Sequence, residues 1–150
     1  MRLLLPVSLE EPRALTDAAI LFADRLDAEL LVLHVVPALL SGPLLPETGL
    51  GFDTTSYIPF DPETRREIER ADTLALERFV HERFERPVRT ALREGDPAIV
   101  IVEDARVQGV DMILMGHHRH NFLERLLSGS VARSVLAHAP CPVLVMPLEG

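Results

Sequence analysis

Uninterrupted apolar runs alternate with helix-like segments along this chain. Residues 2–7 (RLLLPV) and 29–36 (ELLVLHVV) are apolar at nearly every position, without the in-and-out alternation of a half-exposed strand. Strands that are buried on both faces of a parallel sheet show this pattern. The two runs therefore predict two inner strands of a parallel sheet.

The segment between these runs has the spacing of a helix. Pro12 suits the first helical turn, and Glu10 and Glu11 stand where the helix dipole favours negative charge. The apolar residues that recur at helical spacing are Leu15, Ala18, Ala19, Phe22 and Leu26. The first 36 residues therefore predict a strand–helix–strand unit.

A longer helix is predicted over residues 61–85. Asp61 suits the N-cap and Pro62 the first helical position. Its expected apolar face consists of Ile68, Leu74, Leu76, Phe79 and Val80. The following residues 87–95 (PVRTALREG) are less apolar and alternate in part, which indicates an edge strand.

Residues 96–109 (DPAIVIVEDARVQG) are ambiguous by residue type, because residues 99–102 are all β-branched. Asp96 as N-cap, Pro97 in the first turn and Gly109 at the end favour a helix. A strand over 110–116, a helix from Gly129 to about His138 and a strand over 141–147 complete the pattern.

The order of these elements predicts an α/β fold of one domain over residues 1–150. Strands that alternate with helices form an open, mainly parallel sheet, here five-stranded and Rossmann-like, with helices on both faces. Residues 37–62 break the pattern, since they are rich in proline and glycine. A loop of this length is either a lid or binding loop or a mobile surface excursion, and the sequence leaves both open.

Composition limits the classes of function. The net charge of -8 argues against a general nucleic-acid binder, which needs a basic surface. No apolar run approaches the ~20 residues of a membrane-spanning helix, and the first apolar run is too short for a signal peptide. The single cysteine, Cys141, excludes an intrachain disulfide and fits a reducing compartment. We expect a cytoplasmic protein without membrane or nucleic-acid partners.

The fold class indicates where a ligand would bind. Open parallel sheets bind ligands beyond the carboxyl ends of their strands. In this chain those ends are Pro6, Val7 and Ser8, then Val35, then Met115 and Gly116. The helix that starts at Gly129-Ser130 offers backbone N–H groups and a hydroxyl to an anion, although the same pair also serves as an ordinary helix cap.

The sequence gives less support to a metal site or to an enzyme active site. His117, His118 and His120 are close in sequence, but no acid or cysteine completes a first shell at an obvious spacing, so we expect no metal site. Cys141 stands between prolines and is expected to be packed rather than reactive. The chain contains no lysine and hence no P-loop lysine, and no nucleophile motif is recognisable, so no catalytic residue is assigned.

Three segments together resemble the universal stress protein family. They are VDMILMGHHR (110–119), LLSGSVARSVLAHAPCPVLVMP (126–147) and REGDPAIVIVEDA (93–105), and ELLVLHVV is similar to the second strand of the family. The resemblance covers most of the chain in the right order. It implies an adenine nucleotide alpha-hydrolase-like fold, a UspA-like domain and a role in the stress response.

The nucleotide-binding members of that family carry a loop of the form G-x2-G-x9-G-[ST]. Gly116, Gly129 and Ser130 match it at the required spacing, but Arg119 replaces the middle glycine. Ser8 stands where binding members tend to carry an aspartate. Arg119 either fills the phosphate site or serves as a phosphate ligand, because its guanidinium has a fork of donors.

The resemblance implies a non-catalytic stress-response regulator with ATP or another adenine nucleotide at this loop, with Mg²⁺ only as a companion of the nucleotide. The cofactor-binding residues expected are Pro6, Val7, Ser8, Val35, Met115, Gly116, Arg119, Gly129, Ser130 and Val131. It also implies a homodimer through the last strand, Pro142 to Met146. The alternatives are a nucleotide-free homodimeric adaptor with an unknown protein partner, a weak ATPase, and an ordinary inner position for the last strand.

Overall fold

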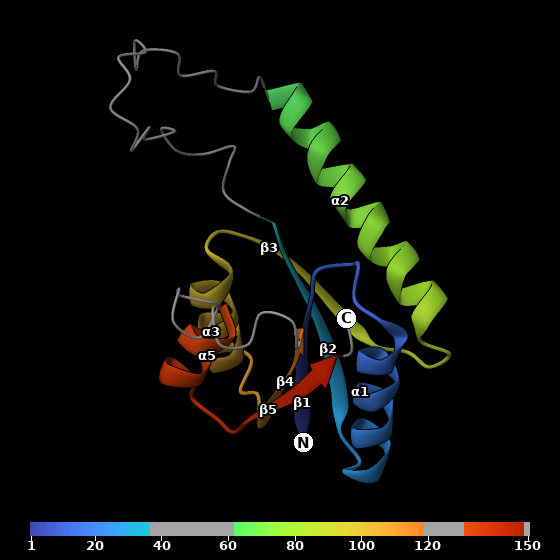
Figure 1. Cartoon of the computed structure of the whole chain (residues 1–150). Helices are drawn as coiled ribbons and strands as arrows, with labels where there is room; N and C mark the ends of the chain where they lie inside the picture. Colours follow the sequence, from blue (N-terminus) through green and yellow to red (C-terminus); the bar gives the residue numbers. More distant parts are fainter. Residues whose placement is uncertain (37–61, 119–130, 149–150) are drawn as a thin grey trace.

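One five-stranded parallel sheet organises the molecule (Figure 1). The computed structural model describes residues 1–36, 62–118 and 131–148. The strands lie in the order β3-β2-β1-β4-β5, and every neighbouring pair is parallel. The elements are β1 (Arg2–Val7), α1 (Arg13–Arg25), β2 (Glu29–Val36), α2 (Pro62–Arg83), β3 (Arg89–Glu94), α3 (Pro97–Val107), β4 (Met112–His118), α5 (Val131–His138) and β5 (Val143–Leu148). The predicted α/β fold is confirmed.

The apolar core is divided into two layers by the sheet. Leu3, Leu5 and Val7 of β1 belong to the layer under α1 and α2, whereas Leu4 belongs to the layer under α3 and α5. Figure 1 shows these helix pairs on opposite sides of the sheet. Successive side chains of a strand point to opposite faces, so a strand covered on both sides has to be apolar throughout. This explains the uninterrupted apolar run of residues 2–7.

The helix after β3 begins as predicted, whereas the helix after β1 begins one residue later than predicted. At α3, the Asp96 side chain accepts a hydrogen bond from the Ile99 backbone N–H at 3.1 Å, and Pro97 is the first helical residue, as predicted. At α1 the prediction was off by one position. Pro12 is the N-cap in extended conformation, and the first turn contains no acidic residue, so Glu10 and Glu11 precede the helix.

The apolar faces of α1 and α2 are shorter than predicted. Leu26 is 38% exposed because it is the C-cap of α1, and Leu74 on α2 is 61% exposed. On α2 only Leu76 and Phe79 are buried. Figure 1 shows why, because the first part of α2 projects beyond the sheet and only its last turns lie against it.

The last two strands also differ from the expectation. β4 continues two residues past Gly116, and His117 and His118 pair with Pro147 and Leu148 of β5. Extension of β5 to Leu148 makes this possible, so His117 and His118 belong to β4 and not to the loop that was predicted to follow Gly116. β3 and β5 are the two edge strands, which confirms the edge assignment of β3 and rules out an inner position for β5.

Residues 37–61, which make up all but the last position of the predicted long loop, lie outside the described residues. Its final residue, Pro62, is the first residue of α2, as the helix prediction required. Among the helices that the structure describes, none is long and apolar enough to cross a membrane.

Candidate functional site

The connections leaving β1 and β4 diverge at the middle of the sheet. From β1 the chain passes through α1 to β2, and from β4 it passes through α5 to β5 on the other side. α1 and α5 lie on opposite faces of the sheet (Figure 1). Open α/β sheets bind ligands at such a switch point, outside the carboxyl ends of the strands. The candidate site is therefore the carboxyl end of β1 and β4.

The pairing of β1 with β4 stops early. β1 pairs with β2 over six positions, from Arg2 to Val7. With β4, in contrast, the described ladder contains only Leu3 with Met112 and Leu4 with Ile113. Pro6, further along β1, has no N–H to donate to a neighbouring strand. The carboxyl ends of the two strands therefore extend past their last shared pair, at the place where open α/β sheets bind ligands.

The turn after β1 is strained. Ser8 is exposed, and its hydroxyl donates to Glu11 Oε1 at 3.0 Å. The next residue, Leu9, has a φ of 71°, in the left-handed region that leucine rarely adopts. Such a conformation costs about 1–2 kcal/mol and persists only where the surrounding structure enforces it. Strain of this kind is concentrated at ligand sites, and here it lies beside the switch point.

His34 also belongs to this edge, although the sequence interpretation did not include it. Its Nδ1 lies 2.9 Å from the carbonyl oxygen of Val7, its partner in the β1–β2 register. A carbonyl only accepts, so Nδ1 carries the proton and Nε2 is the acceptor in the neutral ring. The signal was a single polar residue inside the apolar run of β2. His34 fixes the end of β1, where Val7 leads into Ser8.

Gly116 lies in a closely packed position. A Cβ atom there would lie 2.6 Å from Leu148 Cδ1 and 3.0 Å from Leu15 Cδ2. This close packing is separate from the approach of a phosphate, the role predicted for Gly116 from the sequence. The side-chain direction of Gly116 is filled by α1 and β5, while neighbouring Met115, at 6% exposed, packs in the opposite layer.

The structure places most of the predicted cofactor-binding residues at one edge. Pro6 and Val7 end β1, Val35 lies near the end of β2, and Met115 and Gly116 lie in the second half of β4.

Ser8 follows β1 directly, and Val131, 38% exposed, is the first residue of α5. The predicted phosphate residues Arg119, Gly129 and Ser130 lie outside the described residues, as does His120.

Metal ligation and thiol chemistry find little support in the described parts of the chain. Within residues 1–36, 62–118 and 131–148, no group of three or more histidines, cysteines or acids could hold a metal ion. Cys141 is partly buried, and this burial, together with the charge of Asp111, raises the pKa of its thiol. The reactive thiolate is therefore disfavoured at neutral pH.

Comparison with known proteins identifies one family. The universal stress protein family matches residues 1–147. Universal stress protein YxiE of Bacillus subtilis (strain 168) is 31% identical over 134 residues, which are 87% of this chain and 86% of that protein.

Solved structures agree with the sequence match. The universal stress protein UspA of Lactobacillus plantarum has a TM-score of 0.64 at 26% identity, over 97% of both chains. A universal stress protein in complex with cAMP has a TM-score of 0.63 at 16% identity, over 98% of this chain and 96% of that one. The second likeness concerns the fold alone. From its sequence and its fold, this chain belongs to the universal stress protein family.

Proposed function

We propose that this protein binds an adenine nucleotide at the carboxyl ends of β1, β2 and β4. The observation that carries the proposal is the early end of the β1–β4 ladder at the switch point, beside the strained Leu9. The similar fold of a family member in complex with cAMP supports an adenine nucleotide as the ligand class. The protein acts as a cytoplasmic stress-response regulator without turnover.

The described residues suit the nucleoside part of such a ligand. Pro6 and Val35, both partly exposed, offer apolar surface to a base, and Ser8 offers a hydroxyl to a ribose, while buried Val7 supports this edge from the core. Ser8 carries no charge, so it holds a ribose less strongly than an aspartate would. The ligand's base therefore contributes more of the affinity than its ribose.

The phosphates would lie at the start of α5. Val131 begins this helix, and Gly129 and Ser130 precede it directly in sequence. Backbone N–H groups at a helix N-terminus, together with a serine hydroxyl, bind anions. Arg119 then acts as a phosphate ligand in place of a glycine, and any Mg²⁺ arrives with the nucleotide.

Calorimetric titration with ATP, AMP and cAMP tests the proposal on the parent protein and on Arg119→Gly. We expect saturable binding by the parent and weaker binding by the variant, because a charge-assisted contact to phosphate is lost. At about a hundred times Kd the ligand adds about 2.7 kcal/mol to the free energy of unfolding, which a shift in Tm also reports. Tighter binding by Arg119→Gly would show that arginine blocks the site, and absence of any binding at millimolar nucleotide would refute the proposal.

A nucleotide-free adaptor is the second candidate, and the projecting part of α2 favours it. Between Pro62 and Ala75 no residue is buried, so this part of the helix is available to a protein partner. A stoichiometric nucleotide in the purified protein would refute this alternative.

For either function we propose a homodimer through β5, because this edge strand is only half-buried from Val143 to Met146.

A further inference from the structure

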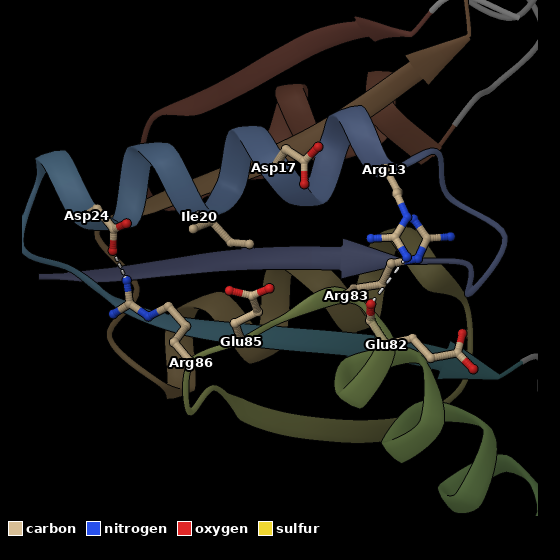
Figure 2. Close-up of a pocket in the computed structure, with 8 residues that line it drawn as sticks. All are labelled: Arg13, Asp17, Ile20, Asp24, Glu82, Arg83, Glu85 and Arg86. Atoms are coloured by element: carbon tan, nitrogen blue, oxygen red, sulfur yellow. Dashed lines mark hydrogen bonds and ion pairs between the residues drawn. The ribbon is translucent and has the colours of Figure 1, made fainter.

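A pocket lies on the face of the sheet that α1 covers, and its Arg13 end is beside the carboxyl end of β1 (Figure 2). It has a volume of about 600 Å³ and lies between α1 and the segment in which α2 ends and leads into β3. Figure 2 shows Arg13 and Arg83 at one end, the ion pair of Asp24 with Arg86 at the other, and Ile20 between them. Its walls come from residues that the nucleotide proposal does not use.

One end of this pocket carries two guanidinium groups that form no ion pair with a carboxylate in residues 1–36, 62–118 or 131–148. Arg13 Nη2 donates only to the backbone carbonyl of Glu82, at 3.4 Å, and Figure 2 shows the Glu82 carboxylate directed away from both arginines. Arg83 lies over the Phe79 ring, 5.2 Å from its centroid, and makes no ion pair with any described carboxylate.

The Nη1 atom of Arg83 is buried and has no hydrogen-bond partner among the described residues. A buried N–H without an acceptor costs about 1–3 kcal/mol. Arg13 and Arg83 also repel each other unless an anion lies between them. The repulsion between the two guanidinium groups favours an anion at this end of the pocket.

The middle of the pocket has the opposite charge. Asp17 lies one turn after Arg13 on α1, about 6 Å further along the helix axis. Glu85 follows the end of α2 and points into the space between α1 and α2 in Figure 2. Neither acid forms an ion pair within the described chain, whereas Asp24 is neutralised by Arg86. Glu82 is unpaired as well, but its carboxylate is directed away from the arginines in Figure 2, so the free charges within the pocket are those of Arg13, Arg83, Asp17 and Glu85.

We propose that this pocket binds a small amphoteric ligand of the amino-acid class. Its carboxylate lies between Arg13 and Arg83, its amino group lies at Asp17 and Glu85, and its aliphatic chain covers Ile20. Guanidinium groups bind carboxylates through paired donors, so the two arginines suit the carboxylate end of such a ligand. A polyphosphate does not fit this pocket, because four carboxylates line it.

Three matched probes test the charge pattern: ε-aminocaproate, hexanoate and hexylamine. Their binding to the full chain is measured by NMR chemical shifts and by calorimetry. We expect saturable binding of ε-aminocaproate, with shifts at Arg13 and Asp17, and binding about tenfold or more weaker for each analogue that lacks one charge. Absence of saturable binding, or equal binding of hexanoate or inorganic phosphate, would overturn the proposal.

Variants locate the site. Arg83→Met keeps an aliphatic chain over Phe79 and should weaken ε-aminocaproate binding about tenfold. Asp17→Asn, at an exposed position that tolerates change, should weaken it as well and remains informative if Arg83→Met fails to fold. Arg70→Gln, on the exposed surface of α2 outside the pocket, is the matched control and should bind like the parent. Unchanged binding by Asp17→Asn would contradict the assignment, and ATP titration of the same variants separates this site from the nucleotide site.

Discussion

At the scale of single residues, the two fully or nearly buried polar residues in the described part of the chain, Thr16 and Asp104, each have a hydrogen-bond partner. Thr16 is fully buried, and its hydroxyl donates to the Arg13 carbonyl oxygen at 2.9 Å. Asp104 is 7% exposed, and its Oδ1 accepts from Arg93 Nε at 3.0 Å, whereas its Oδ2 is buried without a partner among the described residues. A buried carboxylate without a cation is costly, so Arg93 is needed for the stability of α3 on the sheet.

Gly116→Ala should lower the free energy of unfolding by about 1–3 kcal/mol, the usual cost of overpacking a core. The new methyl group would meet Leu148 of β5 and Leu15 of α1. Urea denaturation measures the loss. If Gly116 serves only phosphate approach, the free protein keeps its stability and the packing explanation fails.

The same change in a Leu148→Val background is the control. Valine lacks the Cδ1 atom that lies nearest to the new methyl group, so the added cost of Gly116→Ala should be smaller there. An equal cost in both backgrounds would show that Leu148 is not the obstacle.

Glu29 gives the amino end of the sheet a dependence on pH. Arg2 Nε donates to this carboxylate at 3.0 Å and Arg89 Nη1 at 3.3 Å. The hydrogen bond from Arg2 and the charge of Arg89 lower the pKa of Glu29 below its ordinary 4.5. Because the folded pKa is the lower one, this group stabilises the fold above pH 4.5, and the contribution disappears as pH falls through the folded pKa.

Glu29→Gln should therefore unfold at a lower urea concentration than the parent at pH 7, with a small difference for an exposed group. The two midpoints should converge as the pH falls below 4.5. Glu77→Gln, an exposed acid on α2 outside this cluster, controls for the change in net charge. A gap that persists undiminished in strong acid would show that Arg2 and Arg89 do not act through the charge of Glu29.

At the scale of elements, short capping signals decide the helix limits more than residue preference does. α3 is rich in β-branched residues, yet Asp96 and Pro97 start it as a helix because they satisfy or remove N–H groups of its first turn. In α2, by contrast, residue preference determines the length of the helix more than burial does. Its long run of helix-forming residues extends it past the sheet, although only its last turns bury side chains.

Asp96→Ala should destabilise the protein by about 1 kcal/mol, since the Ile99 N–H loses its acceptor. Asp96→Ser keeps a side-chain acceptor at the cap and should retain most of the stability. Thermal unfolding of the three proteins provides the comparison. Equal losses for alanine and serine would exclude the cap as the cause.

At the scale of the whole molecule, the two edges of the sheet differ in character. β3 presents exposed Arg89, Thr90 and Arg93, and charges on an edge oppose pairing with another strand. β5 presents half-buried apolar residues instead, from Val143 to Met146. Of the two sheet edges that the structure describes, β5 is therefore the one at which we propose the homodimer interface.

Val145→Lys should shift the protein from dimer to monomer, because a lysine on this edge strand would have to be buried at the interface. Light scattering coupled to size-exclusion chromatography over a range of concentrations measures the change. Val107→Lys, at an 81% exposed position on α3, is the matched control and should remain dimeric. A monomeric parent, or an unaffected Val145→Lys dimer, would contradict the β5 interface.

The positions of candidate-site residues could be predicted where they follow from a local sequence pattern. Pro6, Val7 and Val35 were placed because parallel strands end together at one edge of the sheet. His34 was missed because its partner, the Val7 carbonyl, comes from a strand 27 positions away in the sequence. The pocket around Arg83 was missed for the same reason, since it joins α1 to the end of α2.

The sequence by itself determined the order of elements, the parallel sheet and the family, because apolar periodicity and capping residues act over a few neighbours along the chain. Only the tertiary structure decided which residues meet. It extended β4 to His118 through pairing with β5, filled the space beside Gly116 with Leu148 and Leu15, and left the β1–β4 ladder short. Contacts between segments distant in sequence depend on how the layers pack, and no local pattern encodes that.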